Sequence, residues 1–227
     1  MRVLSIWAHC DDELIFGWPL LQNEVIENHL LLCCHQDHRG DDRRLRGMKQ
    51  VCEQEGIHFV DNLGLPNNFF NEKHIPYETA ASRIKIGIHD AIEKVQPDFV
   101  FGHNPIGEYG HGAHRMLFKL TFEHPSVERW VTTSTTHRSK GYHSDGTFHQ
   151  FWMDNLYAEG NYIEEAELEQ DFIDRTKKVY DDLNGPAWFI FPKKKTSIYT
   201  LVGEELKSVR ERVPDEAMPK HWSFYRS

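Results

Sequence analysis

Two short stretches of the sequence combine side chains that bind metal ions and carry protons. His9 and Asp12 stand three apart in "AHCDDE", near the start of the chain. The same spacing separates His111 and His114 in "GEYGHGAH". Residues three apart lie on one side of a helical turn, and a catalytic zinc ion is usually held by three imidazole or carboxylate ligands that leave a position for water. These stretches therefore indicate a metal site that activates water, with one ligand more than the ion needs.

Short apolar runs precede both stretches and are typical of strands buried on both faces of a sheet. We predict strands at residues 3–8, 30–34, 58–60 and 98–102. The apolar spacing between them predicts helices at about 42–55 and 77–95, and an irregular helix after Asp12. Alternating strands and helices form parallel βαβ units, which build an open three-layer α/β sheet. Such sheets bind ligands beyond the carboxyl ends of their strands, so the two stretches should meet at one edge.

The second half of the chain has a weaker pattern, and its topology stays open. We predict a helix at 164–183, closed by Asn184 and Gly185, and strands at 129–136, 187–191 and 197–202. No linker or internal repeat divides the chain, so we expect a single domain over residues 1–227.

Composition argues against several classes of protein. The formal net charge of −9 leaves no dominant basic field for a phosphate backbone, so no nucleic-acid partner is expected. No apolar run reaches the roughly 18 to 20 residues that span a bilayer. The four cysteines form no CxxC pair and no disulfide framework, which fits a reducing compartment. We expect a cytoplasmic protein that is not transmembrane.

The two stretches also resemble known motifs. "AHCDDE" is similar to the AHPDDE signature of the PIG-L/LmbE-like zinc-dependent de-N-acetylases, and "GEYGHGAH" is similar to that family's second metal motif, GxYGHxDH. The likeness covers residues 1–122, the metal-site core, and fades over 123–227, which we expect to complete the substrate pocket. It implies a Rossmann-like αβα fold and hydrolysis of the N-acetyl amide of an amino sugar, linked to a nucleotide, lipid or glycan.

The resemblance assigns roles to four residues of the motifs. His9, Asp12 and His114 would bind one zinc ion per chain. Asp11 would be the general base that takes a proton from water. Zinc lowers the pKa of a bound water to about 7 and polarises an amide carbonyl, so it would assist both reactants. An alternative for Asp11, as the cap of the following helix, stays open.

Four further residues match family positions near the substrate. His111 and Tyr109 would stabilise the tetrahedral oxyanion. Arg44 would bind a substrate hydroxyl or phosphate group, and Asn67 would contact the sugar more weakly. The alternatives are a solvated helix face for Arg44 and a packing role for Tyr109.

Three departures from the motifs bear on this assignment. Cys10 stands where the signature has proline, Ala113 where it has an acid, and Asn67 where the turn has an acid. In the family the acid at the position of Ala113 orients the first histidine of the motif, which is His111 here. His111 should therefore find another partner, such as Asp37 or a backbone carbonyl. The alternative functions are an amidase on an acylated thiol-sugar conjugate and a sugar-binding protein that has lost its activity.

Cys10 and the stretch 137–155 have no role as metal ligands in this assignment. Cys10 is either an oxidation-sensitive neighbour of the site or a small buried residue. The aromatic and histidine-rich stretch 137–155 is expected to supply the acceptor pocket through Trp152 and Tyr142, because aromatic faces stack on sugars.

Overall fold

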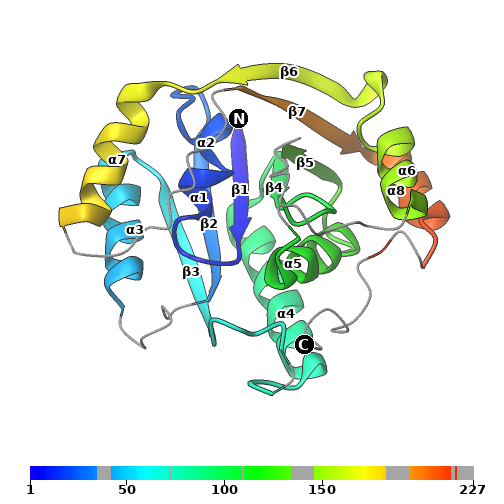
Figure 1. Cartoon of the computed structure of the whole chain (residues 1–227), viewed down its shortest axis with the longest axis horizontal. Helices are drawn as coiled ribbons and strands as arrows, with labels where there is room; N and C mark the ends of the chain where they lie inside the picture. The colour runs from blue at the N-terminus through cyan, green and yellow to red at the C-terminus, as the bar shows by residue number, and fades with distance from the viewer. Residues whose placement is uncertain are drawn as a thin grey trace.

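The computed structural model contains a mixed sheet with the strand order β3-β2-β1-β4-β5-β7-β6 (Figure 1). It describes residues 1–34, 42–71, 73–108, 110–133, 146–182, 195–215 and 218. Within these ranges the strands are β1 (Arg2–Trp7), β2 (Glu27–Cys34), β3 (His58–Leu65), β4 (Phe99–Gly102), β5 (Arg129–Thr133), β6 (Tyr162–Glu167) and β7 (Lys195–Val202). The first five strands are parallel. β7 pairs antiparallel with β5, and β6 pairs antiparallel with β7.

The order in which strands are added to the sheet reverses at β1. It places β2 and β3 on one side of β1 and then crosses to place β4 and β5 on the other side. β1 is therefore hydrogen-bonded in parallel to both β2 and β4. In Figure 1 the arrow of β1 runs from the N-terminus toward the level of α5. The carboxyl ends of β1 and β4 form the topological switch point at which open α/β sheets bind ligands.

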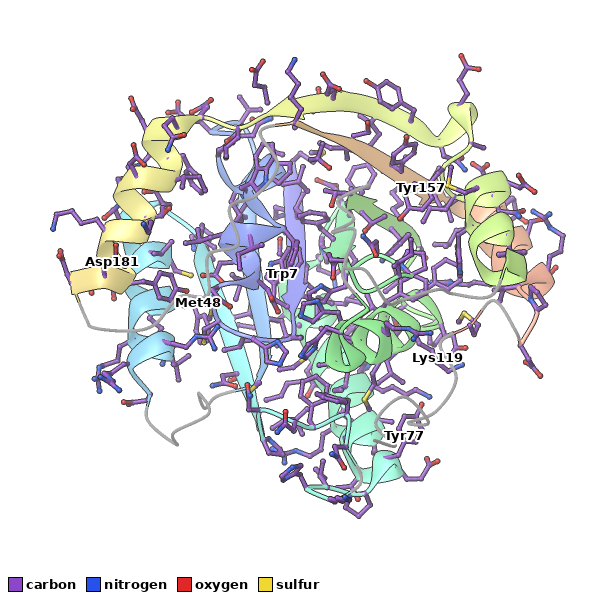
Figure 2. The ribbon with its side chains drawn as sticks, viewed as in Figure 1. Trp7, Met48, Tyr77, Lys119, Tyr157 and Asp181 are labelled. Carbon is purple, nitrogen blue, oxygen red and sulfur yellow. The ribbon has the colours of Figure 1, made fainter. Side chains whose placement is uncertain are left out.

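Helices cover both faces of the sheet (Figure 1). They are α1 (Asp12–Ile15), α2 (Trp18–Leu21), α3 (Arg43–Gln54), α4 (Tyr77–Val95), α5 (Gly112–Phe122), α6 (Gly146–Asn155), α7 (Gln170–Asp182) and α8 (Gly203–Arg212), with a 3-10 turn at Glu159–Asn161. Residues of α1, α2, α3 and α7 share one core, which includes Trp7 and Met48 (Figure 2). Residues of α4 and α5 form the core on the opposite face. Leu30 and Leu32 of β2 belong to the first core and Leu31 to the second, as the two-residue period of a strand requires.

The predicted α/β architecture, three-layer with a mostly parallel sheet, is confirmed. The helix expected at 77–95 is α4, and its buried face carries Ile84, Ile88 and Ala91. The irregular helix expected after Asp12 is divided into the short helices α1 and α2. Among the described residues, no helix is both long enough and apolar enough to cross a bilayer.

The prediction of a helix at 164–183 is wrong in its first part. Residues Tyr162–Glu167 form β6, a strand with mostly exposed side chains, and α7 begins at Gln170. Glutamate is a good helix former, but backbone pairing with β7 outweighs this weak preference. Charged side chains also protect an edge strand from pairing with another chain. The strand expected at 187–191 and the closing residues Asn184 and Gly185 lie outside the described residues.

Trp152 belongs to the core and not to a sugar pocket. It is fully buried and packs edge-on against Phe118 and Phe122 of α5. The prediction that its ring stacks on a sugar is therefore wrong, because the ring is fully buried among core side chains. Tyr142 lies outside the described residues.

Candidate metal and catalytic site

The carboxylate of Asp12 is the centre of the site. β1 ends at Trp7 and α1 begins at Asp12, so the turn between them lies beyond the end of the strand. Oδ2 of Asp12 accepts the backbone N–H of His9 at 2.8 Å and lies 3.3 Å from Nδ1 of the same histidine. It also lies 3.3 Å from Nε2 of His114 on α5. The three predicted ligands are therefore gathered around one oxygen atom.

The far nitrogen of each ligand histidine faces an oxygen acceptor. Nε2 of His9 lies 3.3 Å from the backbone oxygen of Asn67, and Nδ1 of His114 lies 2.7 Å from Oε2 of Glu108. A carbonyl or carboxylate oxygen only accepts, so these nitrogens carry the protons. A neutral ring then has its lone pair on the nitrogen that faces Asp12. Histidines that bind metals are oriented in this way, so the donor set fits a zinc ion.

Glu108 is a residue of the site that the sequence reasoning missed. Its Oε2 accepts from His114 and, at 3.0 Å, from Nδ1 of His103, while its Oε1 accepts the backbone N–H of Asn104 at 3.0 Å. Burial opposes ionisation of this carboxyl, but His103 and His114 outweigh burial and lower the pKa of Glu108 to about 2. Glu108 therefore orients His114, whereas the acid that the family has at the position of Ala113 orients the first histidine of the motif. The available signal was the acid in "GEYGH" itself.

His103 supports the ligands from the end of β4. Its Nε2 accepts the backbone N–H of Ala8 at 3.2 Å, and its Nδ1 donates to Glu108. Its ring stacks on that of His114, with centroids 3.9 Å apart. At this site, two groups of residues place potential metal-binding atoms within 4.8 Å of one another: His9 with His111 and His114, and Asp12 with His103 and His114. Because both ring nitrogens of His103 already have partners, we assign it to support and not to ligation.

The electrostatics of the site favour a positive charge beside Asp12. Burial opposes ionisation of Asp12, but His114 and His9 outweigh it and hold the pKa of this carboxyl well below its usual range. Burial also opposes protonation of His114, but Asp12 and Glu108 raise the pKa of His114 to about 10. Two buried carboxylates thus stabilise a cation at this point, which is the charge that a metal ion brings.

Asp11 is turned away from its helix and toward Arg44. It has a left-handed backbone with φ of 93°, and its side chain makes no capping hydrogen bond to α1. The guanidinium of Arg44 instead pairs with the Asp11 carboxylate and donates to the backbone oxygen of Cys10. Arg44 is only 6% exposed, so it is not a solvated helix face. Strained backbone of this kind is common at functional sites.

Glu13 fixes the backbone of the same turn. Its Oε2 accepts the N–H of Asp11 at 2.7 Å, and its Oε1 accepts the phenol O–H of Tyr180 on α7. Burial raises the pKa of Glu13 to about 8, even though the hydrogen bond from Tyr180 acts in the opposite direction. Tyr180 is fully buried, so this contact connects the site to the C-terminal half of the chain.

His111 and Asn67 lie beside the predicted ligands. The ring centroids of His111 lie 5.0 Å from His9 and 4.6 Å from His114. Burial disfavours its charged form, and the neighbouring His114 and His9 act in the same direction, so the pKa of His111 falls to about 2. Asn67 meets His9 through its backbone oxygen. Tyr109 lies outside the described residues.

Cys10 is a buried residue of the α3 and α7 core. It is 6% exposed, and burial, followed by the charge of Glu13, raises the pKa of its thiol well above the usual range. A protonated, buried thiol is inert compared with a thiolate. Of the two alternatives for Cys10, the structure favours the small buried residue over the oxidation-sensitive neighbour of the site.

Residues 4–124 match the sequence profile of PIG-L, described as GlcNAc-PI de-N-acetylase. The chain belongs to the PIG-L family. An uncharacterised protein of Acanthamoeba polyphaga mimivirus is 27% identical to this PIG-L chain over 137 residues, which is 53% of this chain. The match covers 56% of that relative, so the chain spans about half of its length.

Solved structures share the fold of this PIG-L chain at low identity. Dbv21, the deacetylase of the pseudoaglycone of the antimicrobial reagent A40926, aligns with a TM-score of 0.58 and 12% identity, over 88% of this chain and 97% of the other. The N,N'-diacetylchitobiose deacetylase from Pyrococcus horikoshii aligns with a TM-score of 0.56 and 14% identity, over 89% and 84% of the two chains. At these identities the likeness extends to the fold alone.

Proposed function

We propose that this protein is a hydrolase that removes the acetyl group from the nitrogen of a GlcNAc-like amino sugar, with one zinc ion at the catalytic site. The observation that carries the proposal is the convergence of His9 and His114 on Oδ2 of Asp12, with Asp11 in the same turn. Membership of the PIG-L family, described as GlcNAc-PI de-N-acetylase, and the likeness in fold to deacetylases support the same reaction. The four cysteines are buried and none of them is in a disulfide bond, which supports a reducing, cytoplasmic location.

His9, Asp12 and His114 would hold the zinc ion. When bound, zinc supplies Lewis acidity, which lowers the pKa of water to about 7 and polarises the amide carbonyl. Asp11 accepts a proton from the attacking water, whose oxygen bonds to the carbonyl carbon. The carbon–nitrogen bond then breaks, and Asp11 returns the proton to the departing amine nitrogen. The products are acetate and the free amino sugar.

The residues around Asp11 prepare it for this task. The Arg44 guanidinium favours the ionised carboxylate, the form that accepts a proton, and Glu13 holds the backbone N–H of Asp11. His111 is neutral, and its N–H would donate to the oxygen that gains charge in the tetrahedral intermediate. A donor placed in this way contributes about 3 kcal/mol to transition-state binding. Tyr109 would assist His111 at this oxygen.

Substrate contacts of Arg44 and Asn67 remain predictions. The described contacts of Arg44 are with Asp11 and Cys10, so a substrate hydroxyl or phosphate group would have to share the guanidinium. The Oδ1 of Asn67 lies 3.6 Å from Sγ of Cys34, and its side chain remains the weaker candidate for a sugar contact. Residues 123–227 would complete the pocket for the group linked to the sugar.

The test is acetate release from a panel of N-acetylated amino sugars, free and conjugated, with zinc supplied. We expect turnover that Asp11→Asn reduces to a few per cent or less while zinc remains bound. Asp42→Asn is the matched control, because Asp42 is exposed directly before α3 and its side chain pairs only with Arg46 among its described partners.

Other outcomes identify the alternatives. Release of a different carboxylate from an acylated thiol-sugar conjugate would identify the amidase. If the protein is purified without zinc and hydrolyses no member of the panel after zinc is added, the result supports the third alternative, a sugar-binding protein without activity.

A further inference from the structure

Three potential metal ligands meet at the amino ends of β2 and β3, far from the site around Asp12. Glu27 is the first residue of β2, and His29 lies two positions later, so both side chains are on one face of the sheet. His58 is the first residue of β3 and is the register partner of His29. Leu31 and Val60, two positions further along each strand, both belong to the core under α4. All three side chains therefore share the α4 face.

The contacts among these side chains are already close. Nε2 of His29 lies 2.9 Å from Oε1 of Glu27, and the rings of His29 and His58 stack with centroids 4.8 Å apart. One potential ligand atom from each residue lies within 4.8 Å of the other two. His58 and Glu27 are exposed, whereas the side chain of His29 is 15% exposed.

We propose that Glu27, His29 and His58 bind a second divalent transition-metal ion, of which zinc is the test case. Two imidazoles and one carboxylate are a ligand set that zinc accepts with water in the fourth position. Ligand atoms at zinc distances lie roughly 3.3 Å apart. The potential ligand atoms already lie within 4.8 Å of one another, so each pair needs to shift by no more than about 1.5 Å. The exposed side chains of Glu27 and His58 are free of core packing and can make this movement.

The second site is independent of the first one. Five positions of β2 separate His29 from Cys34 at the carboxyl end of the strand, which is roughly 17 Å. The two sites share no residue and lie at opposite ends of the parallel strands. A metal ion at the second site would connect β3, the edge strand, to β2 just before the register shift between Leu30 and Leu31. It would therefore stabilise the pairing of this edge.

The experiment is a zinc titration of the full chain after chelation, followed by calorimetry. We expect two equivalents of zinc for the wild type and one for the double variant His29→Ala, His58→Ala. The double variant His9→Ala, His114→Ala should keep the equivalent at the second site. At a zinc concentration of 100 times the dissociation constant, the second site should shift the unfolding equilibrium about 100-fold toward the folded state.

A surface-histidine control separates this site from nonspecific binding. His74→Ala removes an exposed histidine from the turn after β3 and should leave both equivalents in place. Circular dichroism establishes that the alanine variants are folded. A wild type that binds a single equivalent, lost in the His9 and His114 variant, overturns the proposal and leaves the proposed function intact. Two equivalents that survive in the His29 and His58 variant also overturn it.

Discussion

Oε2 of Glu108 lies 2.7 Å from Nδ1 of His114, six positions later in the chain. The backbone of Glu108 is left-handed, with φ of 57°, and this turn directs the carboxylate back toward the start of α5. The family motif places its acid directly before the histidine, where this chain has Ala113, a core residue. A carboxylate thus fixes an imidazole of this site from another position, and the imidazole is that of His114 and not the first histidine of the motif.

Replacement of Glu108 should weaken metal binding more than it weakens folding. Glu108→Gln keeps the size of the side chain but removes the charge that orients His114 and stabilises a cation. We expect the zinc affinity of the catalytic site to fall by about 10- to 100-fold, the usual effect of losing such a partner. Competition with a chelator measures this affinity. Glu123→Gln, which removes an exposed partner of Lys119, should have no effect. Equal zinc affinities in wild type and Glu108→Gln would show that Glu108 does not support metal binding.

Arg44→Lys tests whether the guanidinium serves the base or the substrate. Lysine cannot contact the Asp11 carboxylate and the Cys10 carbonyl with one planar group. If Arg44 positions Asp11, kcat should fall by about 10- to 100-fold with little change in KM. Steady-state kinetics on the best substrate of the panel separates the two constants. Arg46→Lys, at an exposed position of α3, is the matched control. A large rise in KM with unchanged kcat would instead assign Arg44 to the substrate, as the family resemblance implies.

The meeting of His9 and His114 at Asp12 could be predicted from sequence because their signal is local and their elements are regular. His9 and His114 follow β1 and β4, and the parallel topology alone requires the ends of these strands to meet. Glu108 and His103 act through a turn with a left-handed residue, which has no periodic pattern to detect. The partner of Arg44 was missed for a related reason. A buried ion pair between Asp11 and a residue 33 positions later depends on tertiary packing, and no local spacing reveals it.

Gly47→Ala should destabilise the contact between α3 and α7. A Cβ at Gly47 would lie 2.8 Å from Cδ1 of Tyr180, whose ring is fully buried. Overpacking of about 1 to 3 kcal/mol exceeds the gain of about 1 kcal/mol that alanine brings to a helix. We expect a net loss of about 1 kcal/mol, which lowers Tm by roughly 2 to 4 °C in a chain of this size. Turnover should fall as well, because Tyr180 holds Glu13.

Gly160→Ala is the control for this substitution. No atom lies within 4 Å of a Cβ at Gly160, so Tm should change little. Equal Tm values for the two alanine variants would show that the Tyr180 ring moves aside without cost. Thermal unfolding followed by circular dichroism gives both values.

The ion pair between Glu55 and Arg175 should make stability depend on acid pH. Arg175 donates to both carboxylate oxygens of Glu55, at 2.9 and 2.7 Å. Burial disfavours the charge of Glu55, but Arg175 outweighs it and lowers the pKa of Glu55 below its usual value. A lowered pKa in the folded state stabilises the protein above the unfolded value of about 4.3, and this contribution is lost as pH falls through the folded value.

Denaturant unfolding at several pH values tests this contribution. The free energy of unfolding of the wild type should exceed that of Glu55→Gln by about 0.5 to 1 kcal/mol at pH 7. This difference should vanish in acid. High salt should reduce it, because Arg175 is half exposed. A difference that persists unchanged in acid would mean that the carboxylate charge contributes nothing.

The strand β6 is an element that local sequence preference predicts wrongly. Its glutamates favour a helix locally, and only the presence of β7, about 30 residues later, makes the extended form the better choice. Local preference therefore predicted α4, whose apolar face is continuous, and failed where two distant segments pair.

The hydrogen bond between Tyr180 and Glu13 joins residues 167 positions apart, and this separation has a consequence for synthesis. The last of the proposed metal ligands, His114, is made about 65 residues before Tyr180. At ribosomal rates of roughly 5 to 20 residues per second, the phenol follows that ligand by about 3 to 13 s. A nascent chain would thus hold every ligand before it holds the support of Asp11. We expect it to capture metal first and to begin turnover only after α7 has emerged and docked.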